Sequence, residues 1–449
     1  MKDALTEEFI SFIYRISTDQ IPLLIERQVK RCLLDYIGVT FAGAKLLKNR
    51  FPNIQKDFIA TNNGESSVIG FNSRANYLEA AFLNGLSSHI AELDDGSRYG
   101  AIHPGCVIIS SLLPLAQEYN ISPHNLLLGI FVGYEASIRI ASSIQPSHYE
   151  IGYHTTSTCG SIGAAVGISA MMKFSEKQMR DAFSAAVLTS SGMLKVIEDD
   201  SDLKPYNVGR SVQSAIYSSL AGKLGFKGPK EVLAGTRGYF SMVSREIDAN
   251  KLLSKNIQSY CISKVYFKIY PSCRHTHAPI DAAIKLRNSC KINEIERINI
   301  YTYSSIIGKH DHREILGISS AKMSIPFCVS LGFFYGKVKL EYFVEENIKN
   351  NELLSLTKKV HVIGDKYFSS LIPEKRGAKV EVLLKNGAIF SEIILSPKGE
   401  PEDPLEDQDL QDKFYSLTKY ADLTREQSTK ISDSVWNIET QLENLFLAL

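Results

Sequence analysis

Apolar residues recur at three- and four-residue spacing through most of the first 255 positions, a pattern typical of amphipathic helices. It predicts helices over residues 6–17, 21–44 and 122–144. The third begins with Ser122 as a cap and Pro123 in the first helical position, and Ser175 with Gln178 forms a capping-box pattern that starts another helix. Residues 158–172 are rich in Gly, Ala and Ser. Because small side chains let helices approach closely, we expect that helix at the centre of a bundle.

From about residue 260 the pattern changes to short runs rich in β-branched and aromatic residues. These runs predict strands over 264–272, 296–306, 358–367 and 378–395. Asn386-Gly387 lies inside the last run and is a strong hairpin-turn signal. Helical patterns at 277–290 and 324–336 lie among the strands, which indicates a small antiparallel or mixed sheet in an α+β domain. Amphipathic helix returns over 405–446, and we expect it to pack on the first domain.

The expected fold class is therefore mainly α with a smaller α+β domain. We place an all-helical domain at residues 1–258, joined by C-terminal helices at 400–449, and the α+β domain at 259–399. The segment 396–407 is the clearest linker, because it is dense in Pro, Gly and acidic residues.

Composition and charge exclude several classes of partner. The chain has 449 residues, 44% of them hydrophobic, which is enough for a sizeable core. Lys and Arg total 50 against 49 Asp and Glu, and the absence of a long basic block excludes nucleic acid as a partner. Acidic residues before the first apolar run argue against a signal peptide, and Gly and Glu interrupt the longest apolar run. We expect a cytoplasmic protein with no membrane partner.

The seven cysteines are scattered and never form a CxxC pair. This spacing suits reduced thiols and makes a cysteine-held zinc or iron–sulfur site improbable from local spacing. The sequence therefore predicts neither a metal nor a cofactor.

Residues 89–105 concentrate two histidines, three carboxylates and an arginine between two apolar helical runs. His103 directly precedes one of these runs, at a helix N-terminus where backbone N–H groups favour anions and keep an imidazole neutral. A neutral imidazole there is ready to accept a proton. A solvated polar loop between helices is an equally good interpretation of this segment alone.

The carboxylates of the same segment fall around a helix end. His89 and Glu92 are three residues apart, so they share a face if the helix that starts near Asn76 continues that far. Asp94 and Asp95, followed by a glycine, resemble the exit of that helix.

Two further groups precede predicted helices. His154 and four hydroxyl residues come just before the small-residue helix, where capping is the ordinary role of a hydroxyl and anion binding is the alternative. Lys204 stands before Pro205, with Arg210 one turn into the next helix. A surface lysine is the ordinary interpretation of Lys204.

Lys268, Arg274, His275 and His277 gather at one strand-to-helix junction. The His-x-His spacing invites a metal interpretation, but two ligands do not make a site, and no H-E-x-x-H motif accompanies them. A pocket for a carboxylate fits four basic groups better, because Arg holds a carboxylate through two parallel hydrogen bonds.

The order of these motifs is more specific than any one of them. It closely resembles the successive signature blocks of the MmgE/PrpD family over nearly the whole chain: "NGLSSHIAELDDG", "HPG", "GYEASIRI", "GYHTTSTCGSIGAA", "LKPYNVGR", "YPSCRHTHAPIDAA" and "AKMSIPF". That family includes 2-methylcitrate dehydratases, cis-aconitate decarboxylases and iminodisuccinate epimerases. The resemblance implies a homodimer in which each chain has a large helical domain and a smaller α+β lid domain.

The resemblance also implies site residues. Four positions match the pocket of the dehydratase and decarboxylase branches: His103, His154, Lys204 and Lys268. Three depart from it, because Glu92 replaces an aspartate, Gly96 a threonine and Phe327 a tyrosine. The predicted catalytic residues are His103, His154, Lys204, Lys268 and Glu92. The predicted substrate-binding residues are Arg274, His275, His277, Asp94, Asp95, Arg210 and Phe327.

The family's reactions share a carbanion-like state next to a carboxylate. Lysines, Arg274 and helix-end amides would stabilise that charge, and His103 or His154 would move the proton. We expect a cofactor-independent lyase for a small di- or tricarboxylic acid and rank a dehydratase first, because that activity is common in the family. An epimerase or a decarboxylase is the alternative, and a non-catalytic binding protein on the same fold is a minor one.

Overall fold

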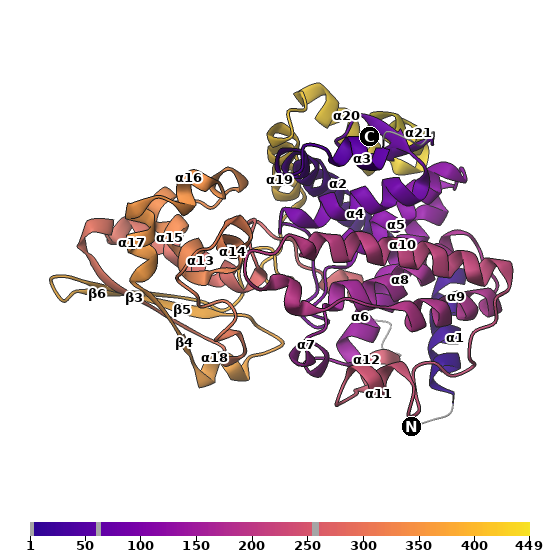
Figure 1. Ribbon diagram of the computed structural model, residues 1–449, viewed down its shortest axis with the longest axis horizontal. Helices are drawn as coiled ribbons and strands as arrows, with labels where there is room; N and C mark the ends of the chain where they lie inside the picture. Colours follow the sequence, from indigo (N-terminus) through magenta and orange to yellow (C-terminus); the bar gives the residue numbers. More distant parts are fainter. Residues whose placement is uncertain (1–3, 60–63, 254–259) are drawn as a thin grey trace.

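The computed structural model describes residues 4–59, 64–253 and 260–449, which form two lobes (Figure 1). The large lobe is built from helices and one short hairpin: α1 (Leu5–Thr18), α2 (Leu23–Arg50), α3 (Ile54–Ile59), β1 (Ser66–Val68), β2 (Ser73–Ala75), α4 (Tyr77–Ile90), α5 (Pro104–Glu118), α6 (Pro123–Ser143), α7 (Ser147–Ile151), α8 (Thr155–Met171), α9 (Glu176–Thr189), α10 (Leu203–Leu224), α11 (Tyr239–Val243) and α12 (Ala249–Leu253). The fold is therefore mainly helical, as predicted.

The small lobe combines a sheet with short helices. Its elements are α13 (His277–Leu286), β3 (Ile295–Thr302), α14 (Ile318–Met323), α15 (Ile325–Tyr335), α16 (Glu345–Ile348), α17 (Asn351–Lys358), β4 (Val360–Gly364), α18 (Lys366–Ser370), β5 (Ala378–Leu384) and β6 (Ile389–Ile394). The strands lie in the order β4-β3-β5-β6, with β3 and β4 parallel and the other pairs antiparallel. Alternate residues of β5 are buried, and α13 packs on that strand. The predicted α+β unit with a mixed sheet is confirmed.

The small-residue helix α8 lies at the centre of the large lobe, as its composition predicts. All of its residues are buried, and it packs along α6. A Cβ atom added at Gly163 would lie 2.7 Å from the carbonyl oxygen of Gly133, and one added at Gly167 would lie 2.6 Å from that of Gly129. Only glycine allows the two backbones to approach this closely.

Helix α6 is long and apolar enough to cross a membrane, but its most apolar stretch is entirely buried among the other helices. Because this helix lies in the protein core, its apolar composition is explained without a bilayer. The caps predicted for α6 and α9 are confirmed: the Ser122 hydroxyl accepts from the Asn125 amide, and Ser175 and Gln178 form the reciprocal capping box.

The strand predicted over 264–272 is wrong. Its only sheet-like contact among the described residues is one antiparallel bridge, between Tyr266 and Gly96. The Phe267 amide donates to the Gly399 carbonyl at 3.0 Å, so the two sides of this segment contact different loops. Its apolar residues are buried where the chain passes from one lobe to the other. The boundary predicted at 258/259 falls outside the described residues.

The last three helices return to the large lobe (Figure 1): α19 (Asp407–Tyr420), α20 (Arg425–Trp436) and α21 (Ile438–Ala448). Helix α19 packs on α2, as the sequence predicts. Lys413 anchors it there, because its Nζ lies 2.6 Å from Asp35 Oδ1 and donates to the Leu93 carbonyl. The C-terminal helices therefore support the segment that leads into the acidic loop described next.

Candidate active site

The acidic loop, residues 91–103, joins α4 to α5. Helix α4 ends at Ile90, and Glu92 has a left-handed backbone with φ of 56°. The condition for His89 and Glu92 to share a helix face, that the helix continues to Glu92, is therefore not met. A left-handed conformation costs a non-glycine residue about 1–3 kcal/mol and is retained where the surrounding structure requires it. Here it allows Glu92 and Asp94 to face the same group of basic side chains.

Three histidine rings meet beside this loop. His103 and His154 occupy the N-cap positions of α5 and α8, as predicted. The ring of His89 lies between them, with centroids 5.4 Å from His103 and 5.8 Å from His154. Two imidazoles that are distant in sequence therefore belong to one cluster.

Hydrogen bonds fix the proton on His103. Its Nδ1 lies 2.6 Å from the backbone carbonyl of Asp95, which can only accept, so Nδ1 carries the hydrogen and Nε2 carries the lone pair. His89 Nδ1 lies 2.7 Å from Asp94 Oδ2. His154 Nδ1 lies 2.9 Å from the Ser157 hydroxyl, which can donate or accept.

Three lysines complete the cluster. The Lys204 ammonium pairs with the Glu92 carboxylate. Lys268, which is fully buried, donates to the Glu92 backbone carbonyl at 3.1 Å and lies 3.7 Å from Asp94 Oδ1. Lys322, at the end of α14, donates to the Ile90 carbonyl at 3.0 Å. The ammonium groups therefore come from both lobes and from the segment between them.

The charges of the cluster follow from its burial. Burial disfavours ionised Glu92 and Asp94, but the nearby lysines and histidines outweigh it and hold both pKa values below the usual range. Burial lowers the pKa of His103 to about 3 and also depresses the pKa of His154, so both imidazoles are neutral at pH 7. Burial lowers the pKa of Lys322 to about 8. Three ammonium groups thus face two carboxylates, which leaves an excess of positive charge.

Asp95 lies behind the cluster and behaves differently. Its carboxylate accepts from the Tyr134 hydroxyl at 2.7 Å and from the Gly105 amide at 3.1 Å. Burial nevertheless raises its pKa to about 7. Asp95 therefore holds the start of α5 in place and contributes little negative charge below neutral pH.

The raised pKa of Asp95 predicts a pH-dependent difference in stability between wild type and the Asp95→Asn variant. The unfolded chain ionises this carboxyl near pH 3.9, whereas the folded chain keeps it protonated until about pH 7. The stability that Asp95 contributes is therefore largest in acid and is lost as the pH rises through that window. Relative to Asp95→Asn, wild type should lose roughly 1–3 kcal/mol of unfolding free energy between pH 5 and pH 8.

Urea unfolding of both proteins at the two pH values measures this difference, and the other titrating groups cancel because both proteins contain them. A difference that stays constant with pH would contradict the assignment of a protonated Asp95.

A pocket of about 420 Å³, including the space at its mouth, opens onto this cluster. Glu92, Lys204 and Lys322 line it together with residues of both lobes. These three side chains of the cluster therefore face a space where the two lobes meet, and a small acid could enter there.

Two departures from the family pattern have a structural explanation. A Cβ atom at Gly96 would lie 2.4 Å from the hydroxyl of Tyr266, so the tyrosine occupies the space of the expected threonine side chain. The Tyr266 ring also contacts the His103 ring, with centroids 6.4 Å apart. Phe327 is fully buried in an apolar group of the small lobe, beside Phe343, and its ring brings no hydroxyl to the cluster.

Arg274 and His277, predicted to bind substrate, lie outside the cluster. The carboxylate that Arg274 holds is that of Glu400, at 3.0 Å, and Glu400 also accepts from Arg98 at 3.0 Å. His277 Nδ1 lies 2.9 Å from the Arg274 guanidinium. The linker segment 396–407 is thus pinned by a buried ion-pair network between the lobes.

Arg210 and His275 also point elsewhere. Arg210 is exposed on α10 and donates to Gln213. His275 bonds to the Tyr303 hydroxyl and lies beside His310, with ring centroids 5.0 Å apart. Of the predicted site residues, the cluster contains Glu92, Asp94, His103, His154, Lys204 and Lys268, and Asp95 lies directly behind it.

Sequence reasoning missed two members. His89 was noted only for its spacing from Glu92, yet its ring is central. Lys322 lies in the "AKMSIPF" block and donates to a carbonyl of the other lobe. No neighbouring residue in the sequence indicates that contact. A charged residue inside an otherwise apolar helical run is the one local signal that could have identified it.

The two-lobed fold and its cluster define a member of the MmgE/PrpD family. The chain matches the MmgE/PrpD N-terminal domain over residues 7–251 and the MmgE/PrpD C-terminal domain over residues 270–438, and it belongs to this family.

Several relatives are similar along nearly their whole length. Human cis-aconitate decarboxylase is 25% identical over 92% of this chain and 88% of its own. The cis-aconitate decarboxylase of Aspergillus terreus is 21% identical over 93% of this chain and 89% of its own. A cis-aconitate decarboxylase-like protein of Aspergillus oryzae is 22% identical over 98% and 95%. The two relatives named as cis-aconitate decarboxylases are lyases.

Proposed function

We propose that the protein is a lyase that decarboxylates a small di- or tricarboxylic acid in the pocket between its lobes. The observation that carries the proposal is the buried cluster of three ammonium groups and neutral imidazoles around two carboxylates. Decarboxylation is preferred over the dehydration ranked first from the sequence because the similar relatives are named for it.

The excess positive charge favours an anionic substrate. Two unit charges about 4 Å apart interact by about 4 kcal/mol at an effective dielectric constant of 20, which is several times their interaction in water. Lys204 and Lys322 both line the pocket and are the groups that a substrate carboxylate would meet first.

Glu92 supplies the opposing charge. Its carboxylate is ionised and lines the same pocket. A substrate carboxylate placed beside it is repelled, and loss of carbon dioxide removes that repulsion. The carbon–carbon bond breaks, its electron pair stays on the substrate carbon, and carbon dioxide leaves. The ammonium groups stabilise the charge that remains.

The carbanion must then take a proton. The substrate's negative charge raises the pKa of a neighbouring imidazole, so His103 or His154 can acquire a proton when the acid binds and pass it to carbon. Lys322 is a second candidate donor, because an ammonium group with a pKa of about 8 is a competent acid near neutral pH.

Incubation of the purified protein with cis-aconitate, citrate-like and aspartate-derived acids in deuterium oxide tests the proposal. Release of carbon dioxide with one deuterium bound to the product carbon supports it. A new alkene without gas release would instead establish the dehydratase, and inversion with deuterium uptake the epimerase. The absence of any reaction across the panel would favour a binding protein.

We also propose that the protein is a homodimer that associates through the exposed face of α10. Leu203, Tyr206, Tyr217 and Leu224 follow one another at helical spacing on this face and are all exposed, Leu224 by 77%. Exposed apolar side chains at both ends of a long helix face, with Arg210 and Gln213 between them, suit a surface covered by a second copy.

The Tyr217→Glu/Leu224→Glu variant should therefore be monomeric, with half the wild-type mass in light scattering. Leu23→Glu is the matched control, since Leu23 is equally exposed on another helix. A monomeric wild type, or a dimer that survives the double substitution, would contradict this arrangement.

A further inference from the structure

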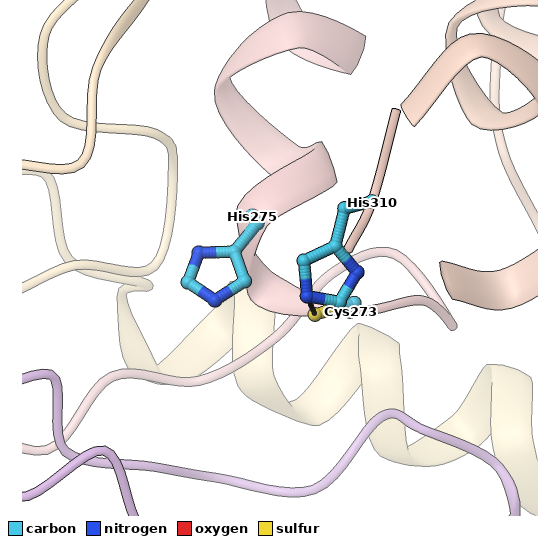
Figure 2. A group of neighbouring side chains, drawn as sticks. All are labelled: Cys273, His275 and His310. Atoms are coloured by element: carbon cyan, nitrogen blue, oxygen red, sulfur yellow. Dashed lines mark hydrogen bonds between the residues drawn. The ribbon is translucent and has the colours of Figure 1, made fainter. Parts of the chain in front are cut away.

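A second group of chemically reactive side chains lies in the small lobe. Cys273, His275 and His310 come together there, the first two beside the start of α13 and the third from the loop before α14 (Figure 2). One potential ligand atom of each lies within 4.8 Å of the others, and Cys273 Sγ is 3.9 Å from His310 Nε2. The reaction proposed above uses none of these residues.

Each imidazole is held through Nδ1, which leaves Nε2 for another partner. His310 Nδ1 donates to the Met323 carbonyl at 3.0 Å, so its Nε2 carries the lone pair that faces Cys273. His275 Nδ1 bonds to the Tyr303 hydroxyl. An outer hydrogen bond of this kind orients a metal-binding histidine and fixes its tautomer.

The backbone also holds the ligands in place. The Cys273 amide donates to the Lys322 carbonyl at 3.0 Å, and the His310 carbonyl accepts from the Ile325 amide at 2.9 Å. The loop that carries Cys273 and the loop that carries His310 are thus both tied to the segment that joins α14 to α15. An ion bound by both loops would strengthen a connection that is already present.

We propose that Cys273, His275 and His310 form a binding site for Zn²⁺, with water as the fourth ligand. One thiolate and two imidazoles are a typical zinc donor set, and an open fourth position is usual when three side chains bind. Tetrahedral zinc places its ligand atoms roughly 3.3–3.8 Å apart. Cys273 Sγ and His310 Nε2, 3.9 Å apart, lie slightly beyond this range, and all three ligand atoms lie within 4.8 Å of one another, so the side chains would rotate inward to bind the ion. Cys273 and His275 are only partly buried, so an ion can reach them.

Charge distinguishes this group from the other candidate set among the described residues, His89, Asp94 and Cys106. That set lies inside the cluster, where Asp94 already pairs with His89 and with the Lys268 ammonium, and the excess positive charge opposes a cation. Near Cys273, Lys309 and Arg376 keep their positive charge, but among the described residues neither forms a hydrogen bond or ion pair with Cys273, His275 or His310. Lys309 lies over the Tyr149 ring, and Arg376 donates to the Arg98 carbonyl.

The inference departs from the sequence-based expectation of no metal. Local spacing showed only His275 and His277 as a pair, and the structure separates them. His277 bonds to Arg274, whereas His275 meets Cys273 and a histidine from much later in the chain. Ligands brought together by tertiary structure leave no motif in the sequence.

Titration of the chelator-treated full chain with Co²⁺ tests the site directly, because cobalt takes zinc's place and its spectrum reports the ligands. We expect one equivalent to bind per chain, with visible bands of tetrahedral cobalt and a thiolate-to-cobalt band in the near ultraviolet. Added Zn²⁺ should abolish both signals. Absence of a thiolate band in the wild type would overturn the proposal and leave only a thiol–imidazole hydrogen bond.

Variants locate the ion. Cys273→Ser should remove the thiolate band, and His310→Ala should weaken Co²⁺ binding by at least about tenfold. Cys290→Ser and Cys106→Ser are matched controls that should retain the wild-type spectrum. Loss of the band in Cys106→Ser but not in Cys273→Ser would place the ion in the other set and refute the assignment. The spectrum does not depend on turnover, so the outcome is independent of the proposed reaction.

Discussion

Replacement of His103 or His154 by Gln should lower kcat by about a hundred- to ten-thousand-fold while the protein remains folded. Glutamine approximates the size of an imidazole and can still donate to the Asp95 carbonyl that His103 contacts. It cannot carry a proton to or from a carbon atom. The loss should therefore appear in turnover, since neither change removes an ammonium group that binds the substrate carboxylates.

Steady-state kinetics with the acid identified in the substrate panel measure this effect, and thermal unfolding confirms that the variants fold. His124→Gln is the matched control, because His124 is exposed on α6 and should leave kcat unchanged. Turnover like that of the wild type in both His103→Gln and His154→Gln would remove the proposed role of the imidazoles.

Replacement of Lys268 by Met should have the largest effect on stability, about 3–5 kcal/mol in the free energy of unfolding. Lys268 is fully buried and faces both Glu92 and Asp94. Its loss leaves Glu92 with Lys204 and Asp94 with His89 as basic partners, and removing one member of a buried ion-pair group costs far more than removing one member of an exposed pair. Activity should fall as well, because one of the three ammonium groups of the cluster is lost.

Urea unfolding of Lys268→Met measures the loss. Lys285→Met is the control: Lys285 pairs with Glu392 at 3.0 Å but is largely exposed, so we expect a change below about 1 kcal/mol. Adding Glu92→Gln to Lys268→Met should recover part of the stability, since it removes one of the two carboxylates that Lys268 faces. If Lys268→Met and Lys285→Met lowered the free energy of unfolding equally, the buried lysine would contribute no more to stability than the exposed one. That result would contradict the prediction.

The features that the sequence predicted correctly are those with local causes. A serine before an apolar helical run makes a cap with its own neighbours, as Ser122 and Ser175 do. His103 and His154 lie at helix N-termini, as predicted from the apolar runs that follow them, and Asn386-Gly387 forms the turn between β5 and β6, with Gly387 at φ of 84°. In each case residues within a few positions determine the geometry.

The features that were missed depend on contacts between distant segments. Lys322 reaches a carbonyl of α4 from the opposite lobe. Tyr266 was assigned to a strand, but its backbone pairs with Gly96 and its hydroxyl takes the space of a missing side chain. Arg274 was expected to bind a substrate carboxylate, and a buried glutamate from the linker meets it first. No local pattern encodes such partners.

The cluster explains why substrate identity is harder to predict than reaction type. The groups that carry charge and protons lie close to the backbone ends of helices α4, α5, α8 and α10, which the fold itself fixes. Positions 96 and 327 differ from the family pattern: Tyr266 fills the space beside Gly96, and Phe327 is buried in an apolar group of the small lobe. The sequence therefore supports the family's general chemistry better than it supports any one substrate.

The most direct test is a crystal structure of the protein with a bound tricarboxylate such as citrate or cis-aconitate. The ligand should lie in the pocket between the lobes, with carboxylates against the Lys204 and Lys322 ammonium groups and with the His103 and His154 rings in contact with it. A ligand bound elsewhere, or histidine rings separated from it by other side chains, would contradict the account.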